Sequence, residues 1–451
     1  MNEWALPTVA LLLMGYGALS ARLRTTMVSQ AMVFVAAGLL VGGRALDLVD
    51  LDAASELVRR LAEATLALVL FADAVRVNLG RLRRESLVPA RLLGVGLPLT
   101  ILAGTLAGLA LFPQLDLWTA AALATILAPT DAALGLPVVS DQRLPSRIRQ
   151  GLNVESGLND GVCVPLLLIF LALAQTSDGA GHVDPLRLLL EEIGFGALAG
   201  LAAGALGALL LRGSAARGWM DRTWKQVDAV ATPLLAYTVA AALGGSGFIA
   251  AFVAGIAYGA LAGERAEATT LLAEESGALL NAVTFLLFGV VLLGRALGEL
   301  DWRIATYALL SLTVVRMLPV AVAMLGTGMR RVTVGFLGWF GPRGLASIVF
   351  VLLLVEQSQL PERPLLLVVV TWTVALSVYA HGLSAHPGAE RYAGWYAAHA
   401  RDRAAVPEAV PVPEHRVRDP ALTRQPTPHA PGEELTMFRY SSRNLGALAA
   451  T

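Results

Sequence analysis

The main pattern in this chain is a succession of long apolar segments separated by short polar stretches. A membrane-spanning helix needs about 20 predominantly apolar residues, so each such segment predicts one spanning helix. The segments are residues 4–21, 26–43, 57–75, 87–112, 117–137, 147–174, 187–211, 226–243, 245–262, 270–294, 302–326, 332–355 and 364–383. The pattern therefore predicts an all-α polytopic membrane protein with about thirteen transmembrane helices.

Two of these segments are interrupted in the middle. The fifth reads TILAPTDAALGLP, where Pro129 removes a backbone donor beside Thr130 and Asp131. Non-helical backbone at membrane depth is tolerated only inside protein or along a cavity. The twelfth segment reads GWFGPRGLASIVF, and its break consists of Gly341, Pro342, Arg343 and Gly344. Paired interrupted helices in corresponding positions of two halves predict a secondary transporter built from inverted repeats.

The sixth segment, RIRQGLNVESGLNDGVCVPLLLIF, carries polar residues in an apolar helix. Ionisable groups at bilayer depth are costly, and they usually face a cavity or a partner that gives them a function. Ser156 and Asp160 are four residues apart, so they share one helical face, and Glu155 and Asn159 share the neighbouring face. One face therefore offers a hydroxyl and a carboxylate to a cation, while Glu155 needs a counter-charge.

Five side chains provide candidate oxygen ligands at membrane depth: Asp160, Ser156, Asp131, Thr130 and, at the inner end of the third segment, Asp73. Carboxylate, hydroxyl and carbonyl oxygens suit hard cations rather than zinc or copper. The hydroxyls of Ser156 and Thr130 could instead satisfy helix backbone, and Asp73 could be solvated. We expect Asp160, Asp131, Ser156 and Thr130 to form a Na⁺ site, with Asp73 as a further candidate.

Buried cations also need partners. Arg316, in SLTVVRMLPV, lies deep in the eleventh segment, and Glu155 is its natural partner for a structural ion pair. Arg343, in the twelfth-segment break, could compensate half-helix ends or nearby acids, and the sequence leaves both open.

The positive charges favour one orientation. With the N-terminus outside, predicted inner loops contain sixteen Arg and Lys residues and outer loops contain seven. Because cytoplasmic loops carry the excess of these residues, we expect the N-terminus outside, the C-terminus in the cytoplasm and the cell membrane as location. The start, MNEWALP, has no basic stretch before its apolar run, so we expect a retained first helix rather than a cleaved signal.

Composition narrows the function classes. The chain of 451 residues is 56% hydrophobic and only 15% charged, with no formal net charge and one lysine, so nucleic-acid binding has no electrostatic basis. The single cysteine, Cys163, excludes an internal disulfide and a cysteine-rich metal site. No Walker loop is present, and the histidines lack metal spacing. We expect no enzyme activity and no cofactor.

The composition changes at about residue 384. Seven prolines lie between Pro407 and Pro431 among charged and small residues. Such a segment cannot bury enough surface to fold. We therefore expect a transmembrane domain over residues 1–383 and a disordered cytoplasmic tail over residues 384–451.

The motifs APTDA, ESGLND and GPRG together resemble the cation:proton antiporter-1 family, the sodium/proton exchangers of NhaP/NHE type. The resemblance covers roughly residues 4 to 383. It implies a homodimer, with a dimerisation domain and a six-helix core in which the fifth and twelfth helices cross. It also implies that Asp160, flanked by Asn159, binds the ion and the proton. It places Thr130, Asp131 and Ser156 near the ion, with Glu155 and Arg316 as an inter-helix ion pair.

The resemblance also implies a mechanism. Desolvation disfavours the charged form of Asp160, so this side chain could bind H⁺ or a cation, but not both at once. Related electrogenic exchangers carry a second acid where this chain has Asn159, so we expect electroneutral one-for-one exchange by alternating access. Na⁺ is the expected cation, with K⁺ or Li⁺ as alternatives. A symporter, a cation channel and an intramembrane aspartyl protease using Asp131 and Asp160 are the rival classes.

Overall fold

Helices occupy all thirteen predicted segments in the structure, a computed structural model that describes residues 3–23, 26–49, 56–76, 87–177, 185–357, 360–399, 407–409 and 412. Within these ranges the chain forms no β-strand, and one isolated bridge pairs Gly42 with Val49. The prediction of an all-α fold is confirmed for this part of the chain.

The helices of the first half are α1 (Ala5–Leu23), α2 (Gln30–Val41), α3 (Glu56–Val75), α5 (Leu87–Arg91), η1 (Leu92–Gly96), α6 (Leu97–Leu111), α7 (Leu117–Ile126), α8 (Leu136–Val139) and α9 (Ser146–Ser177). Those of the second half are α10 (Pro185–Ala216), α11 (Arg222–Ala242), α12 (Gly247–Ala262), α13 (Glu264–Thr269), α14 (Leu271–Leu287), η2 (Phe288–Leu293), α15 (Gly294–Ala296), α16 (Trp302–Leu312), α17 (Val314–Ala323), α18 (Arg331–Trp339), α19 (Leu345–Gln357), α20 (Arg363–His399) and η4 (Pro407–Ala409).

Both predicted interruptions are present. The fifth segment is helical only over α7 and α8, and the twelfth only over α18 and α19. Among the described residues, seven helical stretches are long and apolar enough to cross a membrane, and α2, α7, α12 and α19 are shorter apolar helices. The fold is that of a multi-span membrane protein with one interrupted span in each half, as an inverted repeat predicts.

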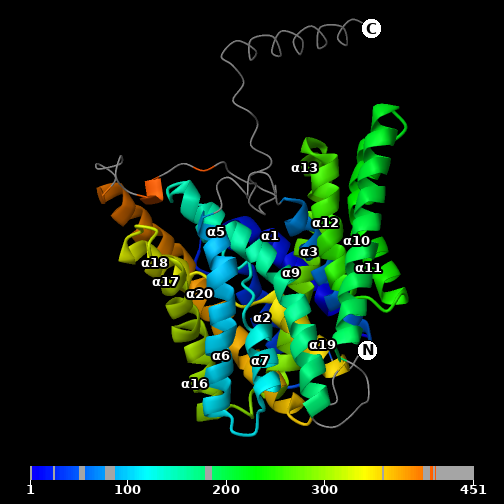
Figure 1. The fold of residues 1–451 in the computed structure, drawn as a ribbon. Coiled ribbons are helices and arrows are strands. Elements are labelled where there is room, and N and C mark those ends of the chain that lie inside the picture. Colours follow the sequence, from blue (N-terminus) through cyan, green and yellow to red (C-terminus); the bar gives the residue numbers. More distant parts are fainter. Residues whose placement is uncertain are drawn as a thin grey trace, which may run out of the picture. The chain divides into compact units, whose positions relative to one another are not determined.

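Close helix packing organises one side of the bundle. Figure 1 shows α10, α11 and α12 gathered together, and α10 and α12 pack along their length. Gly200 and Gly204 of α10 face Ala250 and Ala254 of α12 so closely that a β-carbon at either glycine would overlap the carbonyl oxygen opposite it. Small residues that let helix backbones approach are typical of membrane interfaces. Gly200 and Gly204 of α10 therefore serve helix packing.

The end of the chain differs from the expected boundary at residue 383. Helix α20 continues to His399, and Ala385, Ala389 and Tyr392 on this extension are buried against the bundle. An amphipathic helix can extend beyond the length of a membrane span when one of its faces packs on protein. The length of the apolar segment alone does not predict such an extension. The domain therefore extends beyond residue 383. Of the tail that was expected to be disordered over residues 384–451, residues 400–406, 410–411 and 413–451 lie outside the described residues.

A short segment of the tail also packs on the bundle. The Glu408 carboxylate is fully buried, and its Oε1 accepts hydrogen bonds from Arg330 N (2.7 Å) and Thr333 Oγ1 (2.9 Å) at the start of α18. Arg147 Nη1 donates to Pro407 O (2.7 Å). The segment at Pro407–Ala409 thus joins the beginnings of α9 and α18.

Candidate functional site

The break in the fifth span lies against the polar face of α9. Ser156 Oγ donates to Thr130 O (2.5 Å), and Asn159 Nδ2 donates to Thr130 Oγ1 (2.7 Å). All three residues are buried. Because Pro129 ends the helical hydrogen-bond pattern after α7, the backbone near Thr130 can bond to a neighbouring helix instead. These two bonds fix the broken stretch against α9, next to Asp160 in the chain.

Asp160 lies in the middle of α9 and is 7% exposed. Two glycines lie near it on α9: Gly157 is one turn away, and Gly161 follows directly in the chain. A β-carbon on Gly161 would lie 2.5 Å from the Phe252 ring of α12, and one on Gly157 would lie 3.4 Å from Asp73 Cβ of α3. The carboxylate-bearing stretch of α9 is therefore in close contact with α3 and α12.

One polar atom near Asp160 is unsatisfied. Asn159 is 0% exposed, and its Oδ1 has no hydrogen-bond partner among the described residues. A buried acceptor of this kind is costly unless water or an ion binds it. The oxygen set around Asp160 therefore suits a hard monovalent cation. Within the described residues, no three His, Cys, Asp or Glu side chains gather as a transition-metal site would require.

Arg343 caps the end of α7. Its Nη1 donates to Ala128 O (2.9 Å) and Pro129 O (3.3 Å), and Ser347 Oγ donates to Ile126 O (2.7 Å). The last carbonyls of a helix have no intrahelical partner and carry a partial negative charge. The fully buried guanidinium of Arg343 meets that charge. Of the two roles that the sequence leaves open for Arg343, these contacts support compensation of a half-helix end.

Asp131 makes the reciprocal contact. Its Oδ2 accepts from Leu345 N (3.0 Å), the first residue of α19, and its Oδ1 accepts from Ala133 N (2.8 Å). Asp131 N also donates to Pro342 O (2.7 Å). A carboxylate at a helix N-terminus is stabilised by the unpaired amides there. Both Asp131 oxygens accept from backbone amides, so Asp131 caps the half-helix α19, and its role as an ion ligand stays a prediction.

The glycines of GPRG permit this crossing. A β-carbon on Gly341 would lie 2.5 Å from Arg316 Nε, and one on Gly344 would overlap Asp131 Oδ2. Larger residues would therefore push apart the charged groups that hold the two breaks together.

Two residues that the sequence reading missed support the twelfth-span break from α20. Ser377 Oγ accepts from Arg343 N (2.6 Å) and lies 3.1 Å from His381 Nδ1. His381 Nε2 lies 2.9 Å from Trp339 O, and because a carbonyl can only accept, Nε2 is the donor. A chain of hydrogen bonds thus joins both sides of the break. Ser377 and His381 are four residues apart in an apolar helix, which is the signal that could have found them.

The predicted ion pair is present. Arg316 Nη1 lies 2.6 Å from Glu155 Oε1, and Nη2 donates to Glu155 Oε2 (2.7 Å). Both side chains are 1% exposed, so the two charges are paired away from water. The pair joins α9 to α17, on the face of α9 next to Asp160.

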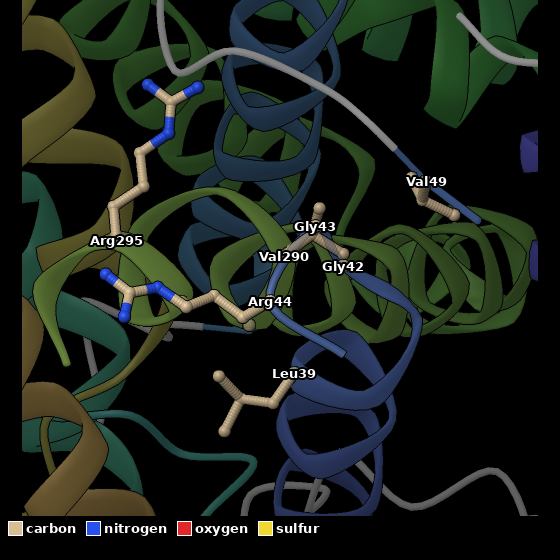
Figure 2. Close-up of a pocket in the computed structure, with 9 residues that line it drawn as sticks. Leu39, Gly42, Gly43, Arg44, Val49, Val290 and Arg295 are labelled. Carbon is tan, nitrogen blue, oxygen red and sulfur yellow. The ribbon is translucent and has the colours of Figure 1, made fainter. Parts of the chain in front are cut away.

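A separate pocket of about 150 Å³ lies between the end of α2 and the helical stretch formed by η2 and α15. Figure 2 shows Arg44 and Arg295 extending to one side of it, opposite Val49. Its lining consists of Leu39, Gly42, Gly43, Arg44, Val49, Gly289, Val290, Gly294 and Arg295. None of the expected ion-binding residues belongs to this set, so the pocket is distinct from the Asp160 cluster.

Comparison with known protein families identifies the relatives of this chain. The family described as "Sodium/hydrogen exchanger, transmembrane" matches residues 8–391, which is most of the chain. The chain belongs to the sodium/hydrogen exchanger family. The match extends beyond residue 383, in agreement with the extension of α20.

Curated relatives of this exchanger-family chain match over shorter stretches. A probable Na⁺/H⁺ antiporter of Schizosaccharomyces pombe is 29% identical over 155 residues, which is 33% of this chain and 20% of that protein. A second S. pombe Na⁺/H⁺ antiporter is 30% identical over 155 residues, covering 33% of each chain. An uncharacterized Na⁺/H⁺ exchanger of Mycobacterium bovis is 32% identical over 139 residues, which is 30% of this chain and 24% of that protein. The match spans at most a third of these relatives.

The fold of this family member also matches solved structures. The sodium proton antiporter MjNhaP1 from Methanocaldococcus jannaschii at pH 8 superposes with a TM-score of 0.68 at 17% identity, covering 86% of this chain and 99% of that one. An electron-microscopy structure of the same antiporter gives a TM-score of 0.67 at 18% identity, covering 88% and 99%. These likenesses establish the shared architecture.

Proposed function

We propose that this chain is a secondary active antiporter that exchanges Na⁺ for H⁺ across a membrane, with Asp160 binding either ion. One observation carries the proposal: Ser156 and Asn159 hold the broken backbone at Thr130 beside the buried carboxylate of Asp160. Half-helix ends and unwound carbonyls at the middle of a membrane bind cations in transporters built from interrupted helices. Family membership and the Na⁺/H⁺ antiport for which the S. pombe relatives are named support the same function.

The chemistry is competition for one carboxylate. A buried carboxylate is disfavoured in its charged form, so it becomes neutral by binding a proton or by pairing with a cation. Asp160 with oxygen donors from Ser156 and Thr130 can take either ion, but the two exclude each other. If the carrier moves only when Asp160 is neutralised, each movement exchanges one ion for the other.

Alternating access would move the contact between α9 and its neighbours. Gly157 and Gly161 give α9 a smooth surface against α3 and α12, which suits sliding between a core and a dimerisation domain. Helix α1 leaves an apolar face uncovered, because Ala5 is its only buried residue and Leu6, Leu11 and Met14 are exposed apolar side chains. Such a face contacts lipid or a second copy.

One-for-one exchange follows from the number of titrating groups. Asn159 cannot take up a proton at the position next to Asp160. Asp131 is the second carboxylate nearby, and both its oxygens already accept hydrogen bonds from backbone amides of the two half-helix breaks. A single proton on Asp160 for each cation makes the exchange electroneutral.

The orientation in the cell membrane is part of the proposal. Arg147 and Arg330, from two predicted inner loops, both contact the segment that contains Pro407 and Glu408. This shared end of the bundle supports a cytoplasmic C-terminus with the N-terminus outside.

The test is cation-dependent dissipation of a pH gradient in proteoliposomes containing the full chain, run with Na⁺, Li⁺ and K⁺. Na⁺ should dissipate the gradient, and Asp160→Asn should abolish the response while folding is retained. The matched control is Asp141→Asn in the loop after α8, which should exchange normally. Cation flux without counter-movement of protons would show a channel, and a response to K⁺ alone would show the potassium alternative. Exchange by Asp160→Asn would refute the assigned site.

A further inference from the structure

Helix α20 supplies hydrogen-bond partners for backbone groups on both sides of the twelfth-span break. On one side, Trp339 O at the end of α18 accepts from Gly341 N (2.8 Å) and from His381 Nε2 (2.9 Å). On the other side, Arg343 N donates to Ser377 Oγ (2.6 Å). Backbone groups at helix ends lack intrahelical partners, so in the protein interior side chains satisfy them. Ser377 and His381 therefore hold the two sides of the break.

A neutral imidazole completes this pattern. Ser377 Oγ accepts from Arg343 N, so its own proton is available to His381 Nδ1, which lies 3.1 Å away. His381 Nε2 donates to Trp339 O, and a neutral ring has this set of one donor and one acceptor. Nδ1 also lies 3.0 Å from Ser377 O, a contact that only a protonated Nδ1 could use. The ring is 1% exposed and stacks on the Trp339 indole with centroids 5.0 Å apart. A side chain that lacks either function would break the bridge between Ser377 and Trp339.

The same break reaches the fifth span through Arg343. Its Nη1 donates to Ala128 O (2.9 Å) and Pro129 O (3.3 Å), the two carbonyls directly before Thr130. Thr130 in turn accepts two hydrogen bonds from α9, the helix that carries Asp160. A continuous series of hydrogen bonds therefore runs from α20 to the candidate ion site. Supporting hydrogen bonds hold ligand groups in binding geometry, and their loss weakens binding although every ligand is still present.

We propose that His381 is a positioning residue for transport. Together with Ser377 it holds the twelfth-span break, and through Arg343 it keeps the broken backbone at Thr130 in the geometry that binds the cation. The neutral imidazole does this without touching the cation and without carrying the transported proton. This inference rests on the proposed cation/proton exchange, and it adds two residues of α20 to those that set the apparent cation affinity.

The test measures the apparent KM for Na⁺ and the maximal rate of pH-gradient dissipation in proteoliposomes containing the full chain. His381→Phe keeps a ring against Trp339 and loses both hydrogen bonds. It should raise the KM roughly three- to tenfold with little change in maximal rate, the effect of about one buried hydrogen bond. Ser377→Ala should raise the KM to a similar extent, because Arg343 N loses its acceptor. His381→Gln keeps a donor and an acceptor, so its KM should be close to that of the wild type.

Two control variants lie on the same helix. Thr373→Val removes a fully buried hydroxyl that donates to Val369 O of its own helix (2.7 Å). His386→Phe replaces a histidine five residues further along the chain. Both controls should keep the wild-type KM. Thermal stability of the purified proteins shows whether each variant is folded, and Ser377→Ala keeps the test decisive if His381→Phe does not fold.

Coupling between the two residues separates this role from a general structural one. In Ser377→Ala/His381→Phe the KM should rise little more than in either single variant, because both residues act on one break. A wild-type KM in a folded single variant, an equal rise in the controls, or multiplied effects in the double variant would each overturn the inference. Loss of maximal rate at an unchanged KM would show a structural role instead. A changed pH dependence of exchange in His381→Gln would show that His381 carries a proton, which also overturns the inference. If the wild type shows no cation-dependent exchange, the proposed function itself fails, which is a distinguishable result.

Discussion

Removing one member of the Glu155–Arg316 pair should destabilise the protein strongly. The two nitrogen–oxygen contacts between the charged groups are 2.6 and 2.7 Å long, and both side chains are 1% exposed. Neither charge can therefore be solvated by water when its partner is removed. Two unit charges about 4 Å apart attract by about 4 kcal/mol at an effective dielectric constant of about 20. This agrees with the roughly 3–5 kcal/mol that stranding a buried charge costs. We expect Glu155→Gln and Arg316→Met each to lower the free energy of unfolding by that amount.

The double variant is the informative one. If the two losses were independent, they would add to about 6–10 kcal/mol. Because replacing a buried pair by neutral residues leaves no stranded charge, Glu155→Gln/Arg316→Met should instead be more stable than either single variant. The assay is thermal stability of the four purified full-length proteins in one detergent, followed by loss of monodisperse protein.

The control for burial is the Asp141–Arg143 pair, which has the same 2.7 Å separation but an Arg143 side chain that is 59% exposed. Asp141→Asn should change stability by less than about 1 kcal/mol, because exposed ion pairs contribute little. Additive losses in the double variant, or an equal loss in Asp141→Asn, would refute the reasoning.

The remaining predictions concern the crossing, the tail and the stoichiometry. Asp131→Asn should keep proton-coupled exchange at a reduced rate and lower the free energy of unfolding by about 1–2 kcal/mol, since it removes only the charge at the start of α19. Complete loss of pH-gradient dissipation in a stable protein would instead make Asp131 an ion ligand. Glu408→Ala should lower the free energy of unfolding by about 1–3 kcal/mol, because Arg330 N and Thr333 Oγ1 lose their acceptor. Glu408→Gln should be less destabilised than Glu408→Ala. Equal stability of both variants and the wild type would show that the tail contact is dispensable. The rate of exchange by the wild type should not change with an imposed membrane potential, whereas the rate of the Asn159→Asp variant should change. A potential-sensitive wild type would show that more than one proton accompanies each cation.

The spans and their two interruptions could be predicted from the sequence alone. Apolar length predicts a membrane helix because every backbone group must be satisfied inside the bilayer, and Pro129 and Pro342 mark breaks because proline cannot continue the hydrogen-bond pattern. Helical spacing was also enough to place Ser156 and Asp160 on one face of α9. The Glu155–Arg316 pair was predictable because two buried opposite charges in separate spans each need a partner.

Which groups meet at the crossing of the two interrupted spans depends on the tertiary structure. Asp131 caps α19 and Arg343 caps α7, and each contact joins residues more than two hundred positions apart. Neither partner is specified by local spacing, because an unpaired half-helix end accepts any suitable charge that the fold brings near. His381 likewise has no partner that its sequence spacing predicts, and only the packing of α20 brings it against Trp339. Helical periodicity and the free-energy cost of polar groups in lipid depend on neighbouring residues in the chain, so the sequence predicts their effects. The pairing of buried charges depends instead on how the helices pack.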